Sequence, residues 1–140
     1  MRTRLVALLL ALAAAPAAAD DGFKVVAHPS NKGAAALGRA ELSKLFLKKS
    51  TRWPDGKEVQ PVEPAEAAVR ERFARKVLDK SPMAVKAYWN QQIFAGRDVP
   101  PLEKPSDAEV VAYVRQNPGA VGYVSGGADT SGLLVIPLRD

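Results

Sequence analysis

Apolar side chains recur at helical spacing in four segments of the chain. The clearest line is formed by Ala65, Val69, Phe73 and Val77, which fall one in every four residues. Side chains spaced in this way share one side of a helix, so this segment is expected to bury a single face. The four expected helices cover residues 37–47, 65–79, 81–96 and 106–119.

Residues that favour helix ends mark two of these segments. Ser81 stands before Pro82, a pair typical of a helix start, and Gly96 follows the last apolar residue as a stop signal. Ser106 and Glu109 have the spacing of a capping box. We therefore expect the third and fourth helices to begin next to these two serines.

Four shorter apolar runs, rich in β-branched and aromatic residues, predict strands. They cover residues 23–29, 58–64, 120–125 and 133–138. Strands and helices alternate along most of the chain, which is typical of an α/β fold with helices on the faces of a sheet. We expect a single three-layer lobe with a mixed, mostly parallel sheet, in which the last strand runs antiparallel.

Two connections between these elements carry their own expectations. The glycine-rich segment "SGGADTSG" at residues 125–132 is interpreted as a hairpin turn that joins the last two strands. An anion-binding nest of backbone amides is the alternative for this segment. The segment "VPPLEKP" at residues 99–105 is expected to be a loop stiffened by its prolines.

The first nineteen residues have the organisation of a secretory signal peptide. Arg2 and Arg4 provide a charged start, Leu5–Ala15 is an apolar run, and Ala17–Ala19 supply a small-residue cleavage site. An uncleaved anchor is the alternative, but the apolar run is short for a membrane span. We expect residues 1–19 to be the leader, residues 20–140 to form one domain, and the product to be periplasmic or secreted, without membrane insertion after the leader is removed.

Charge and composition exclude several classes of function. Without Arg2 and Arg4, the 20 basic residues fall to 18 against 15 acidic residues, which leaves a net charge of +3. The basic residues are scattered and no aromatic residues are interleaved with them, so nucleic-acid binding is not expected. The chain has no Cys and a single His, which argues against thiolate and His-rich metal sites. We expect no metal and no cofactor.

The segment "VQPVEPAEAAVRERF", residues 59–73, runs from a strand straight into a helix. Such a junction is where an α/β protein commonly holds an anion, because free backbone N–H groups and the positive end of the helix meet there. This junction instead carries Glu63 and Glu66, and it has no Gly, Ser or Thr to cradle a phosphate. Carboxylates at this place would repel an anion.

Four motifs in register resemble a known family. They are "AELSKLFLKKSTRWPDG", "VQPVEPAEAAVRERFARKVL", "AYWNQQIF" and "PGAVGYV". Together they resemble one lobe of the type II periplasmic-binding-protein family, specifically of the phosphate-binding component of ABC phosphate transporters. The resemblance covers Phe23–Leu138 and implies a non-enzymatic α/β binding domain. Family members close two lobes on the ligand, so a single lobe implies a second copy, a partner protein or an open, shallow site.

Carrying the family's phosphate contacts onto this sequence changes the expected ligand. With Phe73 as the anchor, the family's arginine falls at Glu63, and its serine-glycine-threonine turn falls at Ala67, Ala68 and Val69. Every phosphate-donating side chain of that motif is replaced by an acceptor or an apolar group. The resemblance therefore implies a degenerate anion site, with weak or absent binding of phosphate or of another small anion.

A second group of candidate ligand contacts follows the first strand. His28, Ser30 and Asn31 form the stretch "HPSN", whose short polar side chains could coordinate an oxyanion. A surface loop shaped by Pro29 is the favoured interpretation, because Ser and Asn are common turn residues. Three large aromatic residues could stack on a ligand, but packing in the core or at an interface is favoured for them: Trp53, Tyr88 and Trp89.

Catalysis is not expected, since no assembled set of catalytic groups is visible. Glu63 and Glu66 could form a pair of acids, but nothing supports the deep cleft that such a pair needs. His28 has no Gly-x-Ser-x-Gly elbow to act on. Two functions stay open: a binding module with a degenerate anion site, and a protein-interaction or dimerising domain that kept the fold and lost its ligand. The candidate ligand contacts are His28, Ser30, Asn31, Glu63, Glu66, Ala67 and Ala68.

Overall fold

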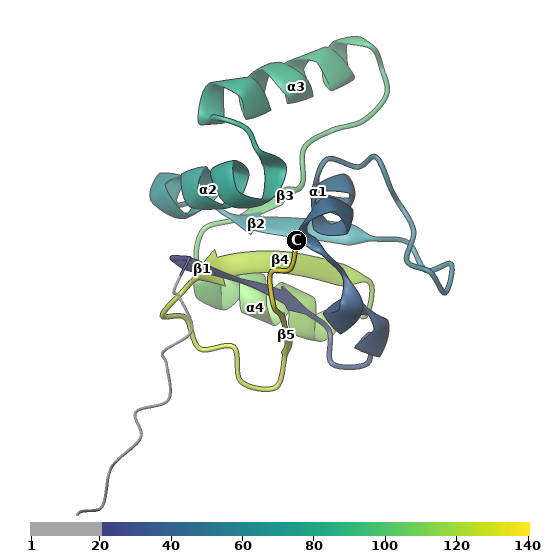
Figure 1. Ribbon diagram of the computed structural model, residues 1–140, viewed down its shortest axis with the longest axis vertical. Helices are drawn as coiled ribbons and strands as arrows, with labels where there is room; N and C mark the ends of the chain where they lie inside the picture. Colours follow the sequence, from purple (N-terminus) through teal and green to yellow (C-terminus); the bar gives the residue numbers. More distant parts are fainter. Residues whose placement is uncertain (1–20) are drawn as a thin grey trace, which may run out of the picture.

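A five-stranded sheet forms the centre of the computed structural model, which describes residues 21–140; the predicted leader lies outside the described residues. The strand order is β3-β2-β4-β1-β5 (Figure 1). β2 pairs in parallel with β3 and β4, whereas β1 pairs antiparallel with both β4 and β5. Four strands therefore point in one direction and β1 alone is reversed, which confirms the mixed sheet. The last strand was expected to be the reversed one, but β5 pairs antiparallel with β1 and so runs in the same direction as β4. The strands are β1 Phe23–Ala27, β2 Gln60–Pro64, β3 Leu102–Lys104, β4 Ala120–Ser125 and β5 Leu134–Ile136.

The four predicted helices are present, with one irregularity. Ser81 and Ser106 accept hydrogen bonds from the N–H groups of Ala84 and Glu109, which confirms both as N-caps. The second helix widens after Phe73 into one π-helical segment, η2. A short 3-10 helix, η1, precedes the first helix. The helices are η1 Lys32–Ala36, α1 Arg39–Phe46, α2 Ala67–Phe73, η2 Ala74–Leu78, α3 Pro82–Phe94 and α4 Asp107–Gln116.

Helices cover both faces of the sheet, so the lobe has three layers. On one face, Phe46 of α1 and Phe73 of α2 pack in the larger core cluster with Tyr123 of β4. On the other face, α4 packs alone, through residues such as Val110, against β1, β2 and β4 (Figure 1). The alternation of side chains along β4 sends successive residues into the two clusters.

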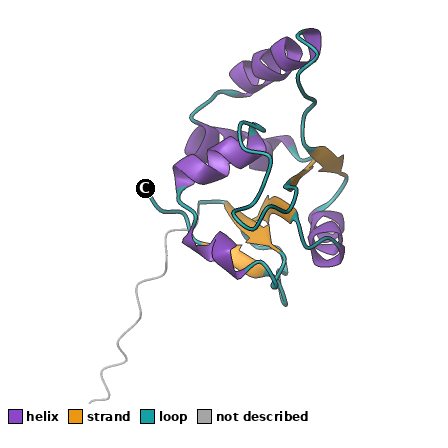
Figure 2. Cartoon of the chain, turned by 90° about the vertical axis from the view of Figure 1, so that its right-hand side faces the viewer, coloured by secondary structure: helices purple, strands orange, loops and turns teal. Residues whose placement is uncertain are grey.

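Helix α3 stands away from these layers (Figures 1 and 2). Trp89 is its one buried residue, and the Tyr88 hydroxyl ties it to the body by donating to the carbonyl of Leu47 at 2.6 Å. Ile93 and Phe94 at its end are 51% and 94% exposed. The helix is thus held at few points and presents apolar side chains to solvent.

The structure corrects two of the predicted connections. Residues 125–132 do not form a hairpin turn, because β4 and β5 both pair with β1, which lies between them. The expected loop at residues 99–105 contains the short strand β3, which pairs in parallel with β2. β3 is a three-residue edge strand, so the neighbouring prolines interrupt no ladder, and it is too short for a periodic pattern.

Core packing of the two tryptophans is confirmed. Trp53 is 3% exposed and its indole N–H donates to the carbonyl of Gly119 at 2.9 Å. Trp89 is 7% exposed and meets the ring of Tyr88 edge-on. None of these aromatic side chains lines the pocket described below.

Candidate functional site

The carboxyl ends of β2, β3 and β4 meet at one edge of the sheet, and Glu63 lies there. Val62 of β2 pairs with Gly122 of β4, so the next residues along, Glu63 and Tyr123, are neighbours in the register. Val62 points into the α4 side of the sheet and Tyr123 into the α1–α2 side. Alternation along β2 therefore turns Glu63 toward α2, on the same face as Tyr123.

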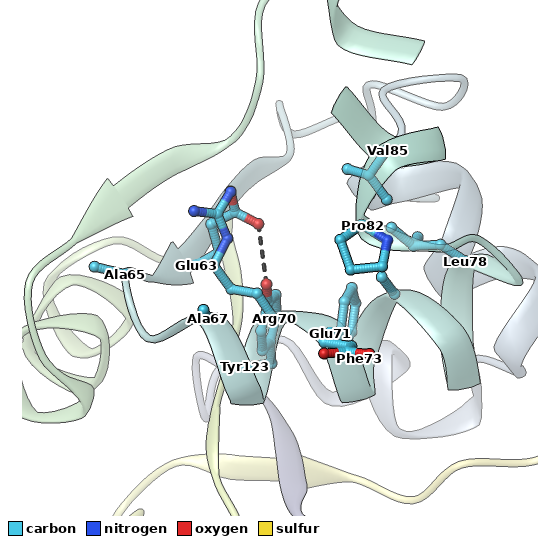
Figure 3. Close-up of a pocket in the computed structure, with 11 residues that line it drawn as sticks. Glu63, Ala65, Ala67, Arg70, Glu71, Phe73, Leu78, Pro82, Val85 and Tyr123 are labelled. Carbon is cyan, nitrogen blue, oxygen red and sulfur yellow. Dashed lines mark hydrogen bonds and ion pairs between the residues drawn. The ribbon is translucent and has the colours of Figure 1, made fainter. Parts of the chain in front are cut away.

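Two donors from different elements hold the Glu63 carboxylate. Nη2 of Arg70, from α2, donates to Oε1 at 2.9 Å, and the Tyr123 hydroxyl donates to Oε2 at 3.0 Å (Figure 3). Arg70 also reaches β3, where its Nη1 donates to Oε2 of Glu103 at 3.1 Å. The guanidinium thus bridges two carboxylates on neighbouring strands. We call Glu63, Arg70, Glu103 and Tyr123 the carboxylate network.

Burial dominates the electrostatics of this network. The Glu63 side chain is 13% exposed, and its burial raises the pKa of the carboxyl, although the charge of Arg70 and the hydrogen bond from Tyr123 act in the opposite direction. Burial, and then the negative charge of Glu63, also raise the pKa of the Tyr123 phenol. Tyr123 therefore stays protonated and acts as a hydrogen-bond donor to Glu63.

A pocket of about 210 Å³ opens beside this network. Its polar lining residues are Glu63, Arg70, Glu71 and Tyr123, and Leu78, Pro82 and Val85 lie across from Glu63 and Arg70 (Figure 3). The apolar wall comes from α2, η2 and the start of α3: Phe73, Ala74, Leu78, Pro82 and Val85. The ring of Phe73 stacks on that of Tyr123 at 3.9 Å between centroids, which fixes the phenol beneath Glu63.

The other junction residues take different places. Ala67 lines this pocket with Glu63, whereas Glu66 lines a separate hollow beside Arg72 and the 125–127 segment. Ala68 is exposed and belongs to neither. The N–H group of Ala65 donates to the carbonyl of Lys104 at 2.9 Å, so it is not free for an anion. The ligand roles of Glu66, Ala67 and Ala68 stay predictions.

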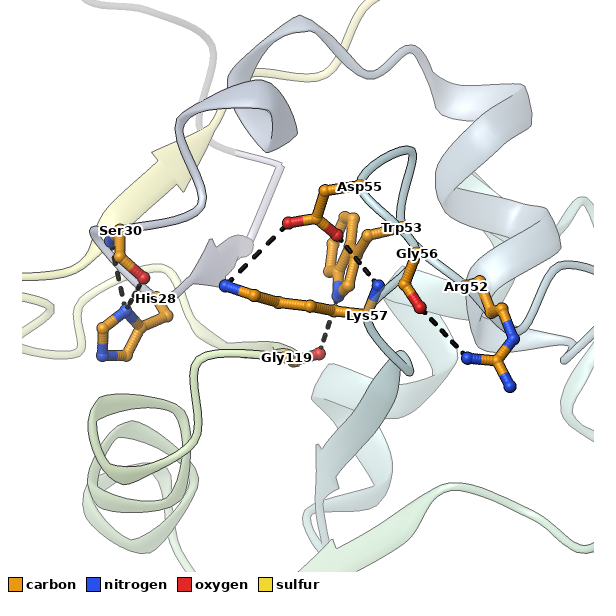
Figure 4. A network of polar contacts seen from close by, with 8 residues as sticks. All are labelled: His28, Ser30, Arg52, Trp53, Asp55, Gly56, Lys57 and Gly119. Carbon is orange, nitrogen blue, oxygen red and sulfur yellow. Dashed lines mark hydrogen bonds and ion pairs between the residues drawn. The ribbon is translucent and has the colours of Figure 1, made fainter.

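The second group of candidate residues lies at the opposite end of the sheet. β1 runs against β4, so Ala27 pairs with Val121, and His28 follows at the level where β2 and β4 begin. Oγ of Ser30 lies 2.7 Å from Nδ1 of His28, and the N–H group of Ser30 donates to the same nitrogen (Figure 4). The structure therefore does not bring the His28–Asn31 loop together with Glu63. The loop has the closed turn that its composition favours, and the ligand roles of His28, Ser30 and Asn31 stay predictions.

Sequence reasoning missed Arg70, Glu103 and Tyr123. Arg70 was not among the predicted ligand contacts, but its side chain is 38% exposed and pairs with both carboxylates. One signal was available, because Arg70 is the first basic residue after the junction and lies one turn into the helix. Tyr123 and Glu103 carry no such signal, since their position beside Glu63 depends on the pairing of strands distant in sequence.

Within residues 21–140, no group of three or more His, Cys, Asp or Glu side chains is placed to hold a metal ion. No helix in this part of the chain has the length and apolar character needed to cross a bilayer.

Comparison with known proteins places the fold. No protein-family model and no curated protein sequence matches the chain significantly. Among solved structures, it is similar to an ABC-type phosphate transport receptor from Vibrio cholerae, with 19% identity and a TM-score of 0.60 over 86% of this chain and 48% of that one. It is also similar to PstS from Borrelia burgdorferi, with 11% identity and a TM-score of 0.59 over 84% and 47% of the two chains.

The chain spans about half the length of these structures, and it has the fold of one lobe of a phosphate-transporter substrate-binding protein. At these identities the likeness concerns the fold alone.

Proposed function

We propose that the chain is an exported, non-enzymatic binding module related to phosphate-transporter substrate-binding proteins, with a degenerate anion site. The observation that supports this proposal most directly is the ion pair between Glu63 and Arg70. A guanidinium that could serve a phosphate is already bound to two carboxylates. The product would act in the periplasm or outside the cell.

A phosphate entering the pocket would have to compete with Glu63 for Arg70. If phosphate displaced Glu63 from Arg70, the Glu63 carboxylate would lose its cation although its side chain is only 13% exposed. Removing the cation from a largely buried carboxylate is unfavourable, because the remaining charge has lost much of its water. Glu71 lines the same pocket and adds a further negative charge. Binding of phosphate is therefore expected to be weak or absent.

The pocket lining also supports a function without catalysis. Its ionisable groups are two carboxylates, one guanidinium and one phenol with a raised pKa. Nucleophilic catalysis needs an activated nucleophile within reach of a base, and this lining offers none.

Calorimetric titration with phosphate, sulfate and molybdate tests the proposal. The unmodified protein is expected to show no submillimolar affinity for these anions. Glu63→Arg removes the competing carboxylate and adds a second guanidinium beside Arg70, so it should bind phosphate at least about tenfold more tightly. Glu58→Arg, with the same change of charge at an exposed site outside the pocket, is the matched control. Submillimolar phosphate binding by the unmodified protein would refute the proposal.

A protein-interaction or dimerising domain is the second candidate function. It is supported by exposed apolar side chains on α3, where Met83 is 81% and Phe94 is 94% exposed. Exposed apolar groups of this size gathered on one element favour contact with another protein. The solved structures similar to this chain are about twice as long, and the partner proposed for this exposed surface is a second copy or a periplasmic protein.

A further inference from the structure

The charges around the Glu63 pocket do not balance. Arg70 faces Glu63 and Glu103, and Glu71 on the pocket lining is paired with Arg75 at 3.1 Å. Three carboxylates thus stand against two guanidinium groups, which leaves one excess negative charge. An incoming anion must break an existing pair, whereas an incoming cation can be added without breaking any.

The Glu63 carboxylate can accept more hydrogen bonds than the two that it receives from the described residues. A carboxylate can accept about four hydrogen bonds, two on each oxygen. Within residues 21–140, Oε1 accepts one from Arg70 and Oε2 accepts one from Tyr123. A donor that enters the pocket can therefore bind Glu63 while both existing hydrogen bonds are kept.

The opposite wall of the pocket sets the shape of such a ligand. Leu78, Pro82 and Val85 face the Glu63 side across the hollow (Figure 3). Apolar walls favour an apolar ligand body, because its transfer from water is favourable. The volume of about 210 Å³ is below that of pockets for drug-sized molecules, so the body must be short.

We propose that this pocket binds a small organic cation, a primary ammonium group on a short apolar chain, with Glu63 as its counter-charge. The ammonium group donates to the free positions of the Glu63 carboxylate, and the alkyl chain lies along Leu78, Pro82 and Val85. This inference rests on the proposed function as a binding module and names the ligand class of the same site.

Calorimetric titration with n-butylammonium chloride tests this assignment. Sodium butyrate and 1-butanol are the matched probes, because they keep the alkyl chain and reverse or remove the charge. We expect saturable binding of n-butylammonium, at least about tenfold weaker binding of 1-butanol, and no binding of butyrate.

Two variants locate the binding. Glu63→Gln removes the counter-charge and should weaken n-butylammonium binding at least about tenfold. Val85→Trp keeps Glu63 but fills the apolar side, and it should abolish binding even if Glu63→Gln fails to fold. Glu58→Gln, an exposed carboxylate outside the pocket lining, should leave the affinity unchanged. Thermal melts establish that each variant is folded.

The outcomes separate this inference from the function on which it rests. If n-butylammonium binds no better than 1-butanol, or if folded Glu63→Gln or Val85→Trp binds it as well as the unmodified protein, the inference is overturned. The proposed function survives that result as long as phosphate does not bind. Submillimolar phosphate binding would instead overturn the proposed function itself.

Discussion

Glu63 keeps its carboxylate inside the protein because Arg70 and Tyr123 reach it from two different elements. Without them, a carboxylate that is 13% exposed would be costly to hold in its charged form. The two donors act unequally, since Arg70 brings a positive charge and Tyr123 brings a neutral hydrogen bond. Burial still outweighs both and raises the pKa of Glu63.

This raised pKa predicts how stability depends on pH. Between the ordinary Glu value of about 4.5 and the raised value, folded Glu63 holds a proton that the unfolded chain has released. The native state binds more protons than the unfolded chain in this window. The stability that Glu63 contributes is therefore fully present below pH 4.5 and is lost as pH rises through the pKa of the folded state. The groups that face Glu63 are Arg70, Glu103 and Tyr123.

Melting temperatures measured from about pH 4 to pH 7 check this prediction. Glu63→Gln cannot titrate, so the melting temperature of the unmodified protein minus that of Glu63→Gln should decline as pH rises. Exposed Glu58→Gln, measured in parallel, supplies the reference. A difference that stays constant or grows with pH would contradict the assigned direction.

At the scale of elements, long periodic patterns were predictable and pairings were not. The line from Ala65 to Val77 predicted α2 and η2, and the serine caps predicted the starts of α3 and α4. The position of β1 between β4 and β5 was missed, because a local turn signal does not tell a hairpin from a crossover. Arg70 and Tyr123 were missed for the same reason, since their contact with Glu63 depends on how elements pack.

Gly122 shows how tightly β4 packs against both β2 and α4. A Cβ atom at this position of β4 would lie 2.8 Å from Cγ1 of Val62 on β2 and 3.0 Å from Cγ1 of Val110 on α4. Both neighbours are fully buried, so neither can move aside freely.

We predict that Gly122→Ala destabilises the fold. The added methyl group overpacks the α4 side of the sheet, at a cost of about 1–3 kcal/mol. Urea unfolding followed by circular dichroism measures this free energy. Gly33→Ala is the matched control, because a Cβ atom there meets nothing within 4 Å. Equal stability of Gly122→Ala and the unmodified protein would show that both Val62 and Val110 can move away from β4.

At the scale of the whole molecule, the chain has the fold of about half of the similar solved structures. The similar solved structures continue for about as many residues again as the chain covers. Most of the lobe buries its apolar side chains in its own core, in one cluster on each face of the sheet. Helix α3 is the exception, because it stands off the layers and exposes Met83, Ile93 and Phe94 (Figures 1 and 2).

The exposed end of α3 predicts self-association if the second candidate function is correct. Phe94 is 94% exposed, so Phe94→Ser removes apolar surface without removing packing inside the lobe. Light scattering coupled to gel filtration should give a mass near two chains for the unmodified protein and near one chain for Phe94→Ser. The melting temperature of the separated chain should not fall, because the exposed Phe94 side chain adds little to packing within it.

Val135→Thr is the control: it changes an apolar residue that is 43% exposed on the edge strand β5, and it should keep the larger mass. A single-chain mass for the unmodified protein at its highest soluble concentration would rule out the dimer, because Phe94 would then face solvent with no second copy to cover it.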